Sequence, residues 1–175
     1  MDIVVGALSF YLTHSHGSFH FGLMDSNDPI PKVDEILGSK VKNSASLCSF
    51  GNLFFNTPSS QSYRYCTNLL HEGDCVRMEV DLDSTPRTVQ FFVNGEVGWF
   101  YVSGIPSSVR IGVSVLFQGS SLRIDNISRL SQPTPFSKEM KESVKKGEQE
   151  GEMTFHTENG MPLSAKPMQS ISNRR

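Results

Sequence analysis

Three absences in this sequence of 175 residues restrict its function before any motif is considered. No apolar run approaches the roughly 20 residues of a membrane-spanning helix, and the N-terminus lacks the basic region of a signal peptide. Neither sign of charge dominates, because 16 Lys and Arg face 18 Asp and Glu, for a net charge of −2. We therefore expect neither a membrane nor a nucleic acid among its partners.

Cysteine is also scarce, and the catalytic signatures that can be recognised in a sequence are missing. Cys48, Cys66 and Cys75 form no CxxC pair and cannot all pair internally, which predicts buried thiols and a cytoplasmic location. The sequence contains no GxSxG nucleophile elbow and no glycine-rich phosphate loop. We therefore predict a protein that is not an enzyme and that needs no cofactor.

A metal site is not expected either. His14 and His16 could place two imidazoles on one side of a strand, and Asp25 could approach them in the fold. No cysteine or third histidine completes a ligand set, and Ser15 and Gly17 make the same stretch equally suitable for a turn. We predict that these histidines bind no metal.

What the sequence does contain is a succession of short strands separated by turns. Residues 19–26, 76–83, 88–93 and 109–117 alternate apolar and polar side chains with a period of two. The dipeptide Asn94-Gly95 predicts a type I′ hairpin, and residues 50–52 predict a second short turn. Strands that recur every 8–12 residues, with no long helical period, indicate an all-β antiparallel sandwich.

The composition changes after about residue 131. Residues 132–175 are polar, mixed in charge and poor in aromatic side chains, so we expect this tail to be mostly disordered. Thr134 as N-cap, Pro135 as the first helical residue and Gly147 as a stop frame one short helix over residues 135–146. The sequence therefore predicts one domain over residues 1–131, followed by the tail.

Three blocks of sequence resemble, in order and spacing, the successive blocks of a SPRY domain. They are SASLCSFGNLFFN, then EGDCVRMEVDLDSTPRTVQFFVNGE, then IGVSVLFQGSSLRI. The match covers roughly residues 1–130, and Arg77 stands where the family often has glycine. The resemblance implies a bent β-sandwich of concanavalin-like jelly-roll topology, which binds a protein or short peptide through loops at one end.

The resemblance also implies a set of partner-binding residues. In peptide-binding members part of the pocket lies at the end of the late strand, here Leu116, Phe117 and Gly119, and loop residues Leu47, Ser49 and Phe50 contribute. The run Trp99-Phe100-Tyr101 adds two candidates by a separate argument. A strand buries only alternate members of such a run, so at least one ring must be exposed, and we predict that Trp99 and Tyr101 act as anchors.

SPRY domains usually begin with strands upstream of the first block that is visible here. Because Met1 falls inside the pattern, we expect an N-terminally truncated copy whose sandwich lacks an edge strand. An uncovered edge invites pairing with another chain.

The acidic ladder Glu79, Asp81 and Asp83 supports one alternative function. Glucan-active jelly rolls carry carboxylates at alternate positions of one strand, and retaining hydrolysis needs two carboxyl groups about 5–5.5 Å apart. Here the last member is an aspartate, one methylene shorter than glutamate, at the position where reach matters most. We therefore predict that the ladder is the solvated face of a half-buried strand, with a glucan-active or glucan-binding protein as the alternative.

Overall fold

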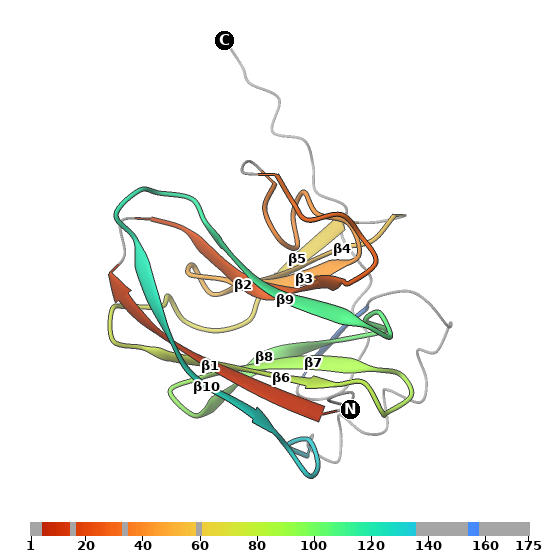
Figure 1. Ribbon diagram of the computed structural model, residues 1–175. Coiled ribbons are helices and arrows are strands. Elements are labelled where there is room, and N and C mark those ends of the chain that lie inside the picture. The colour runs from red at the N-terminus through yellow and green to blue at the C-terminus, as the bar shows by residue number, and fades with distance from the viewer. Residues whose placement is uncertain (1–4, 15–16, 33–34, 59–60, 136–153, 158–175) are drawn as a thin grey trace.

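The computed structural model describes residues 5–14, 17–32, 35–58, 61–135 and 154–157, and every regular element in these residues is a strand (Figure 1). Two antiparallel sheets stack face to face. The six-stranded sheet has the order β10-β1-β6-β7-β8-β11, and the five-stranded sheet has the order β5-β4-β3-β2-β9. The strands are β1 (Val5–His14), β2 (Phe19–Asp25), β3 (Ser44–Cys48), β4 (Asn52–Asn56), β5 (Gln61–Tyr65), β6 (Cys75–Asp81), β7 (Thr88–Val93), β8 (Glu96–Ser103), β9 (Val109–Val115), β10 (Ser121–Arg129) and β11 (Thr154–Thr157).

The predicted fold class is confirmed, because the chain is an antiparallel bent β-sandwich of jelly-roll type. Within the part of the chain described up to β10, the chain crosses between the sheets after β1, β5, β8 and β9, so that β2 to β5 lie in one sheet and β6 to β8 in the other. At the end of the domain, β9 closes one edge of the five-stranded sheet and β10 closes one edge of the six-stranded sheet.

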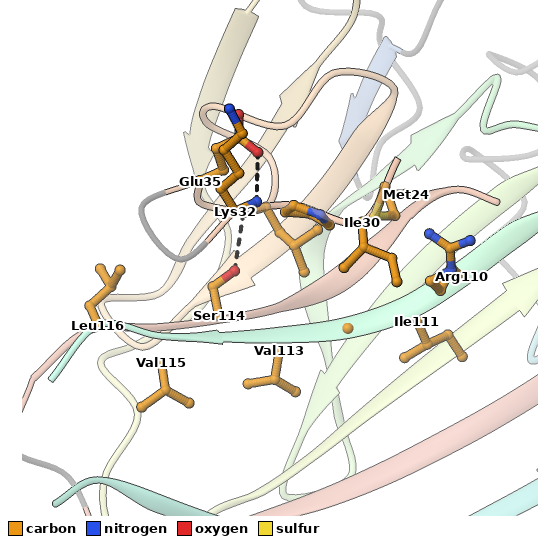
Figure 2. A pocket seen from close by; sticks show the side chains of 13 residues that line it. Met24, Ile30, Lys32, Glu35, Arg110, Ile111, Val113, Ser114, Val115 and Leu116 are labelled. Carbon is orange, nitrogen blue, oxygen red and sulfur yellow. Dashed lines mark hydrogen bonds between the residues drawn. The ribbon is translucent and has the colours of Figure 1, made fainter. Parts of the chain in front are cut away.

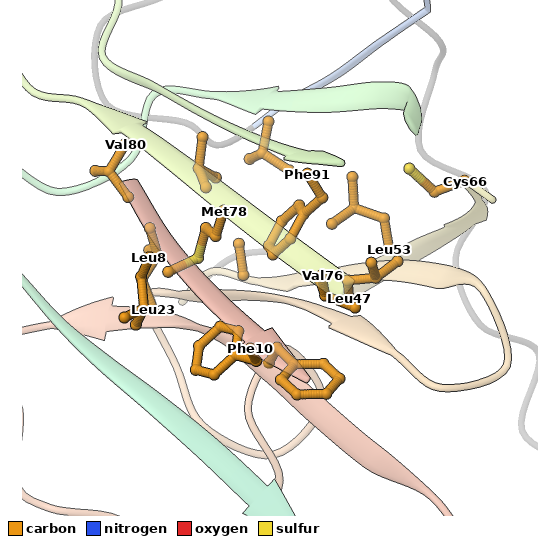
Figure 3. Packing of buried hydrophobic residues seen from close by; sticks show 14 of the residues in the cluster. Leu8, Phe10, Leu23, Leu47, Leu53, Cys66, Val76, Met78, Val80 and Phe91 are labelled. Carbon is orange, nitrogen blue, oxygen red and sulfur yellow. The ribbon is translucent and has the colours of Figure 1, made fainter. Parts of the chain in front are cut away.

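Alternating apolar side chains from both sheets form one core (Figure 3). Phe19, Phe21 and Leu23 of β2 face the same way because residues two apart share a face of a strand. They pack against Phe10 of β1 and the apolar side of β6, and the rings of Phe10 and Phe21 lie 5.1 Å apart. The period-two pattern in the sequence therefore predicted the inward face of these strands.

The turn at Asn94-Gly95 has the geometry that the sequence predicts. Both residues have positive φ, 53° and 88°, as a type I′ hairpin requires. Three strands were not predicted individually, namely β1, β5 and β11. In β1 the alternation of Leu8, Phe10 and Leu12, all buried, carried a usable signal.

The part of the chain after residue 131 is only partly described. Residues 154–157 form β11, which pairs antiparallel with β8, so this segment is a strand within the predicted tail. The predicted helix over residues 135–146 lies outside the described residues except for Pro135. Thr134 is described and lies against the outer face of β6, where its backbone N–H donates to Glu79.

Candidate functional site

Five connections gather at one end of the sandwich, and backbone hydrogen bonds tie them together (Figure 1). The carbonyl of Gly51, in the β3–β4 turn, accepts hydrogen bonds from the N–H groups of Cys66 and Thr67 at 2.7 and 3.1 Å. The carbonyl of Cys66 then accepts the N–H of Trp99 at 2.8 Å. This loop end is therefore a connected framework, on which exposed side chains can be held in fixed positions.

The two loop segments implied by the resemblance lie side by side at this end. The backbone N–H of Ser49 donates to the carbonyl of Phe19, and that of Leu116 donates to the carbonyl of Ser18. Extending the strand registers places Phe50, Ser18 and Leu116 in one row across β3, β2 and β9. Neighbouring strands are about 4.8 Å apart, so Phe50 and Leu116 are separated by about 10 Å.

Large apolar side chains are exposed at the loop end. Phe50 is 55% exposed, Trp99 42% and Phe117 53%. The ring of Tyr65 lies 5.5 Å from that of Trp99. Leu69, which follows Tyr65 in the β5–β6 connection, is also exposed. Tyr65 and Leu69 were not predicted from the sequence, although the outward position of Tyr65 follows from alternation in the stretch QSYRY.

Three of the predicted contact residues are buried, and their roles differ from the predicted ones. Leu47 is a core residue, and Tyr101 is covered on the outer face of β8. Ser49 is buried because its hydroxyl oxygen accepts the backbone N–H of Phe19. These three side chains are therefore not available for contact, whereas Phe50, Trp99, Leu116 and Phe117 are exposed. Gly119 is exposed with a φ of 86° and shapes the β9–β10 connection.

The ring of Phe117 lies directly against the backbone of Gly17. A Cβ atom added at Gly17 would overlap the Phe117 ring and lie 2.6 Å from its Cγ. The ring therefore occupies the space that any other side chain at residue 17 would need. The absence of a side chain at Gly17 lets Phe117 lie close to the chain that leads into β2.

Cys66 is buried beneath the Trp99 segment. Its thiol donates a hydrogen bond to the carbonyl of Phe100 at 3.4 Å, and burial raises the pKa of this thiol to about 11. A Cβ atom added at Gly98 would lie 2.7 Å from the Cys66 sulfur. Cys66 is therefore a buried, unreactive thiol that packs against β8 at Gly98 and Phe100.

Two members of the acidic ladder, Glu79 and Asp81, are buried, contrary to the prediction of a solvated face, whereas Asp83 is exposed as predicted. Glu79 is 2% exposed because Thr134 lies over it, and the buried Asp81 carboxylate accepts the backbone N–H groups of Asp83 and Ser84. One Glu79 oxygen accepts from Arg77 at 2.6 Å and from the Thr134 hydroxyl at 2.8 Å. The other accepts the Thr134 N–H at 2.9 Å and the Gln90 amide at 3.1 Å. Both oxygens are thus engaged in holding structure.

The remaining predictions concern groups that the structure describes only in part. His16 lies outside the described residues, and so does the side-chain environment of His14. Among the residues that are described, no three His, Cys, Asp or Glu side chains come together as metal ligands. None of the described segments is a helix long and apolar enough to cross a membrane.

His20, on the outer face of the five-stranded sheet, gives a prediction about acid stability. Burial lowers the pKa of His20 to about 4, and its Nδ1 shares a hydrogen bond with the Ser46 hydroxyl. The unfolded chain, with a histidine pKa of about 6.5, therefore takes up the proton first as the pH falls. The contribution of His20 is complete above pH 6.5 and is lost toward pH 4, at a cost of about 3 kcal/mol.

The measurement is denaturant unfolding at pH 7.5 and pH 4.5 for the wild type, His20→Gln and His71→Gln. We expect His20→Gln to lose about 2 kcal/mol less than the wild type between the two values of pH. His71 is exposed, so its variant should follow the wild type. Equal losses in all three proteins would contradict a buried, neutral His20.

Comparison with known proteins supports the fold. No family model and no curated protein matches this sequence. A solved human SPRY domain matches with a TM-score of 0.55 and 16% sequence identity, over 70% of this chain and 76% of that chain. The SPRY domain of human HERC1 matches with a TM-score of 0.45 and 16% identity, over 76% and 79%. With its two sheets and jelly-roll order, the chain has the fold of a SPRY domain.

Proposed function

We propose that this protein is a non-enzymatic recognition module that docks a protein or short peptide at the loop end. The observation that carries the proposal is the gathering of exposed Phe50, Trp99, Leu116 and Phe117 on a connected loop framework. Exposed apolar side chains that gather in one region often mark an interaction site, whereas single ones scattered over a surface are normal. The sequence blocks that resemble a SPRY domain support the same kind of function.

The chemistry of the loop end suits a peptide with one or two large apolar side chains. Rings on an ordered backbone bury much area and lose little entropy, because they have only two side-chain torsions. Phe117 on Gly17 and Trp99 beside Tyr65 are anchors of this kind. Backbone groups of the loops would then set the direction of the bound segment.

The absence of catalysis and the cytoplasmic location are part of the same proposal. Both oxygens of Glu79 are engaged by neighbouring groups and the side chain is buried, so Glu79 is not placed to transfer a proton to a glucan. The buried thiols of Cys48 and Cys66 suit a reducing compartment. These features do not favour the glucan-active alternative.

The test is quantitative affinity capture from native lysate, followed by direct binding measurements with each captured protein. We expect Phe117→Ala and Trp99→Ala each to weaken binding of the authentic partner at least about tenfold, as loss of a hot-spot ring does. Ile30→Ala is the matched control, since Ile30 is an exposed apolar residue on the β2–β3 connection, away from the loop end.

The variants must keep the β-type circular dichroism of the wild type for the comparison to count. A partner whose affinity is unchanged by both ring deletions would show that the docking surface lies elsewhere. A partner lost equally with Ile30→Ala would show that the effect is not specific to the loop end.

Gly17→Ala tests how the Phe117 anchor is positioned. Because the new Cβ would occupy the place of the ring, we expect Phe117 to be displaced and partner affinity to fall about as far as in Phe117→Ala. The double variant should then bind no more weakly than either single variant. Isothermal titration of the three proteins measures this, and additive losses would contradict a shared cause.

A further inference from the structure

One long side of the sandwich is open, at the edge strand β9. Leu116 and Ser108 bond to β2 at the two ends of β9, so alternate residues between them also turn their backbone groups toward β2. The other four residues, Val109, Ile111, Val113 and Val115, turn their N–H and C=O groups away from the sheet. No described residue pairs with this row of donors and acceptors.

Edge strands in proteins usually carry features that prevent pairing, and β9 has few of them. It contains no proline and no bulge, since its register with β2 is continuous from Val109 to Val115. Its single charged residue, Arg110, is tied back by hydrogen bonds from its guanidinium to the carbonyls of Ser26 and Asp28. An unprotected edge of this length is a template for another strand.

Apolar surface borders the inner side of this edge. Ile111 is paired with core Leu23, so it faces the space between the sheets, yet it is 42% exposed. Across the opening, Ile127 of β10 is paired with core Leu8 and is 67% exposed. A cavity of about 200 Å³ lies between them, lined also by Val80 and Val109.

The outer side of the edge is a groove of about 420 Å³ (Figure 2). Its far wall is lined by Ile30, Pro31, Lys32, Glu35 and Leu37, and Leu37 donates its backbone N–H to the Ser114 hydroxyl. Figure 2 shows Val113 and Val115 pointing to one side of β9 and Ser114 to the other. Lys32 and Glu35 place one charge of each sign in this wall.

These features define the occupant by its chemistry. A row of unpaired backbone groups needs a matching row of donors and acceptors, which an extended polypeptide supplies and a lipid or small molecule does not. The strand must be apolar at alternate positions, to face the opening, and small or polar between them, to face the groove. The sequence of β9 itself, Val-Arg-Ile-Gly-Val-Ser-Val, has this pattern.

We propose that the edge of β9 binds β9 of a second copy of this chain, in an antiparallel pair about a two-fold axis at Gly112. This register places Ile111 opposite Val113 of the second copy, and both turn their backbone groups toward each other. Gly112 lies opposite its own equivalent, where the two strands approach most closely. Arg110 lies opposite Ser114, so no two like charges on the strands face each other.

A two-fold axis brings the same surface of both copies together, so a groove wall that carries charges of both signs can form opposite-charge contacts with its equivalent. Lys32 and Glu35 meet that condition. The pairing closes on itself, since each copy uses its single β9 edge, and the product is a dimer with a continuous sheet across two sandwiches. Leu116 lines both surfaces, but Phe50, Trp99 and Phe117 do not line the groove, so the dimer is compatible with docking at these three rings.

The experiment is the molar mass of the full chain in solution, by light scattering after size exclusion, at about 100 µM, where a Kd near 1 µM gives mostly dimer. We expect a dimer for the wild type and a monomer for Ile111→Lys and Val113→Pro. The lysine places a charge on the inner side of the edge, and the proline removes an outward N–H without removing a bond to β2. Val97→Lys is the control, because Val97 is 46% exposed on β8, and it should remain a dimer.

Hydrogen exchange of the wild type tests the same interface without a variant. The amides of Val109, Ile111, Val113 and Val115 should exchange fast in dilute protein and at least about tenfold more slowly in concentrated protein. A wild type that is monomeric at about 100 µM, with exchange independent of concentration, would overturn the proposal. A dimer that persists in both β9 variants, or that Val97→Lys also dissociates, would overturn it equally.

Discussion

Gly22→Ala is expected to destabilise the domain by about 3 kcal/mol or more, the upper range for overpacking a well-filled interior. Gly22 lies in β2, the strand between β3 and β9 in the five-stranded sheet. An added Cβ would overlap the backbone carbonyl oxygen of Ala45 and lie 2.7 Å from the Cα of Ser46. A backbone cannot turn aside as the end of a side chain can, so β3 as a whole must move.

Gly112→Ala is the matched control for this prediction, because Gly112 is the partner of Gly22 across the β2–β9 ladder. Its added Cβ would meet only the end of the Leu37 side chain, at 3.3 Å. We expect a change within about 1 kcal/mol, as for most substitutions without a backbone clash. Denaturant unfolding at neutral pH, at a protein concentration low enough for light scattering to show a monomer, measures both variants without a contribution from pairing at Gly112, and equal effects would contradict the clash at Ala45.

The inward face of the sandwich could be predicted from the sequence because it depends on local alternation. In β2, β6 and β7 every second residue is apolar, and these residues form the core. The turn at Asn94-Gly95 was predictable for a similar reason, since the requirement for positive φ is local.

The outer faces could not be predicted in the same way, because their burial depends on segments distant in the sequence. Alternation places Glu79 and Tyr101 outward, and the sequence alone gives no sign that Thr134 lies over Glu79 or that β11 adds a strand beside β8. The burial of Ser49 is similar, since it depends on a hydrogen bond from Phe19, 30 residues away. Phe50, Trp99 and Phe117 were predicted as contact residues and are exposed. The prediction was wrong for Ser49 and Tyr101, whose burial depends on contacts distant in the sequence.

The second large effect concerns Glu79, a buried residue on the outer side of β6, whose carboxylate interacts with four neighbouring donor groups. In Glu79→Ala the Arg77 guanidinium loses its carboxylate, the Thr134 N–H loses its acceptor, and the Gln90 amide keeps only the Thr134 carbonyl. Removing one partner of a buried ion pair costs about 3–5 kcal/mol. Because Arg77 retains contact with water and lies 4.0 Å above the Phe92 ring, we expect the lower value, about 3 kcal/mol.

Glu79→Gln and Asp83→Ala distinguish this structural role from a catalytic one. The glutamine keeps an acceptor for Thr134 and should cost less than the alanine, whereas Asp83 is exposed and its loss should change stability by no more than about 0.5 kcal/mol. Faster amide exchange at Thr134 in Glu79→Ala would show that the carboxylate holds this segment against β6. Hydrolysis of a β-glucan by the wild type, lost in Glu79→Gln at unchanged stability, would instead assign the ladder to catalysis. Since the four hydrogen bonds to Glu79 converge from β6, β7 and residue 134, we expect stability to change and no hydrolysis to be found.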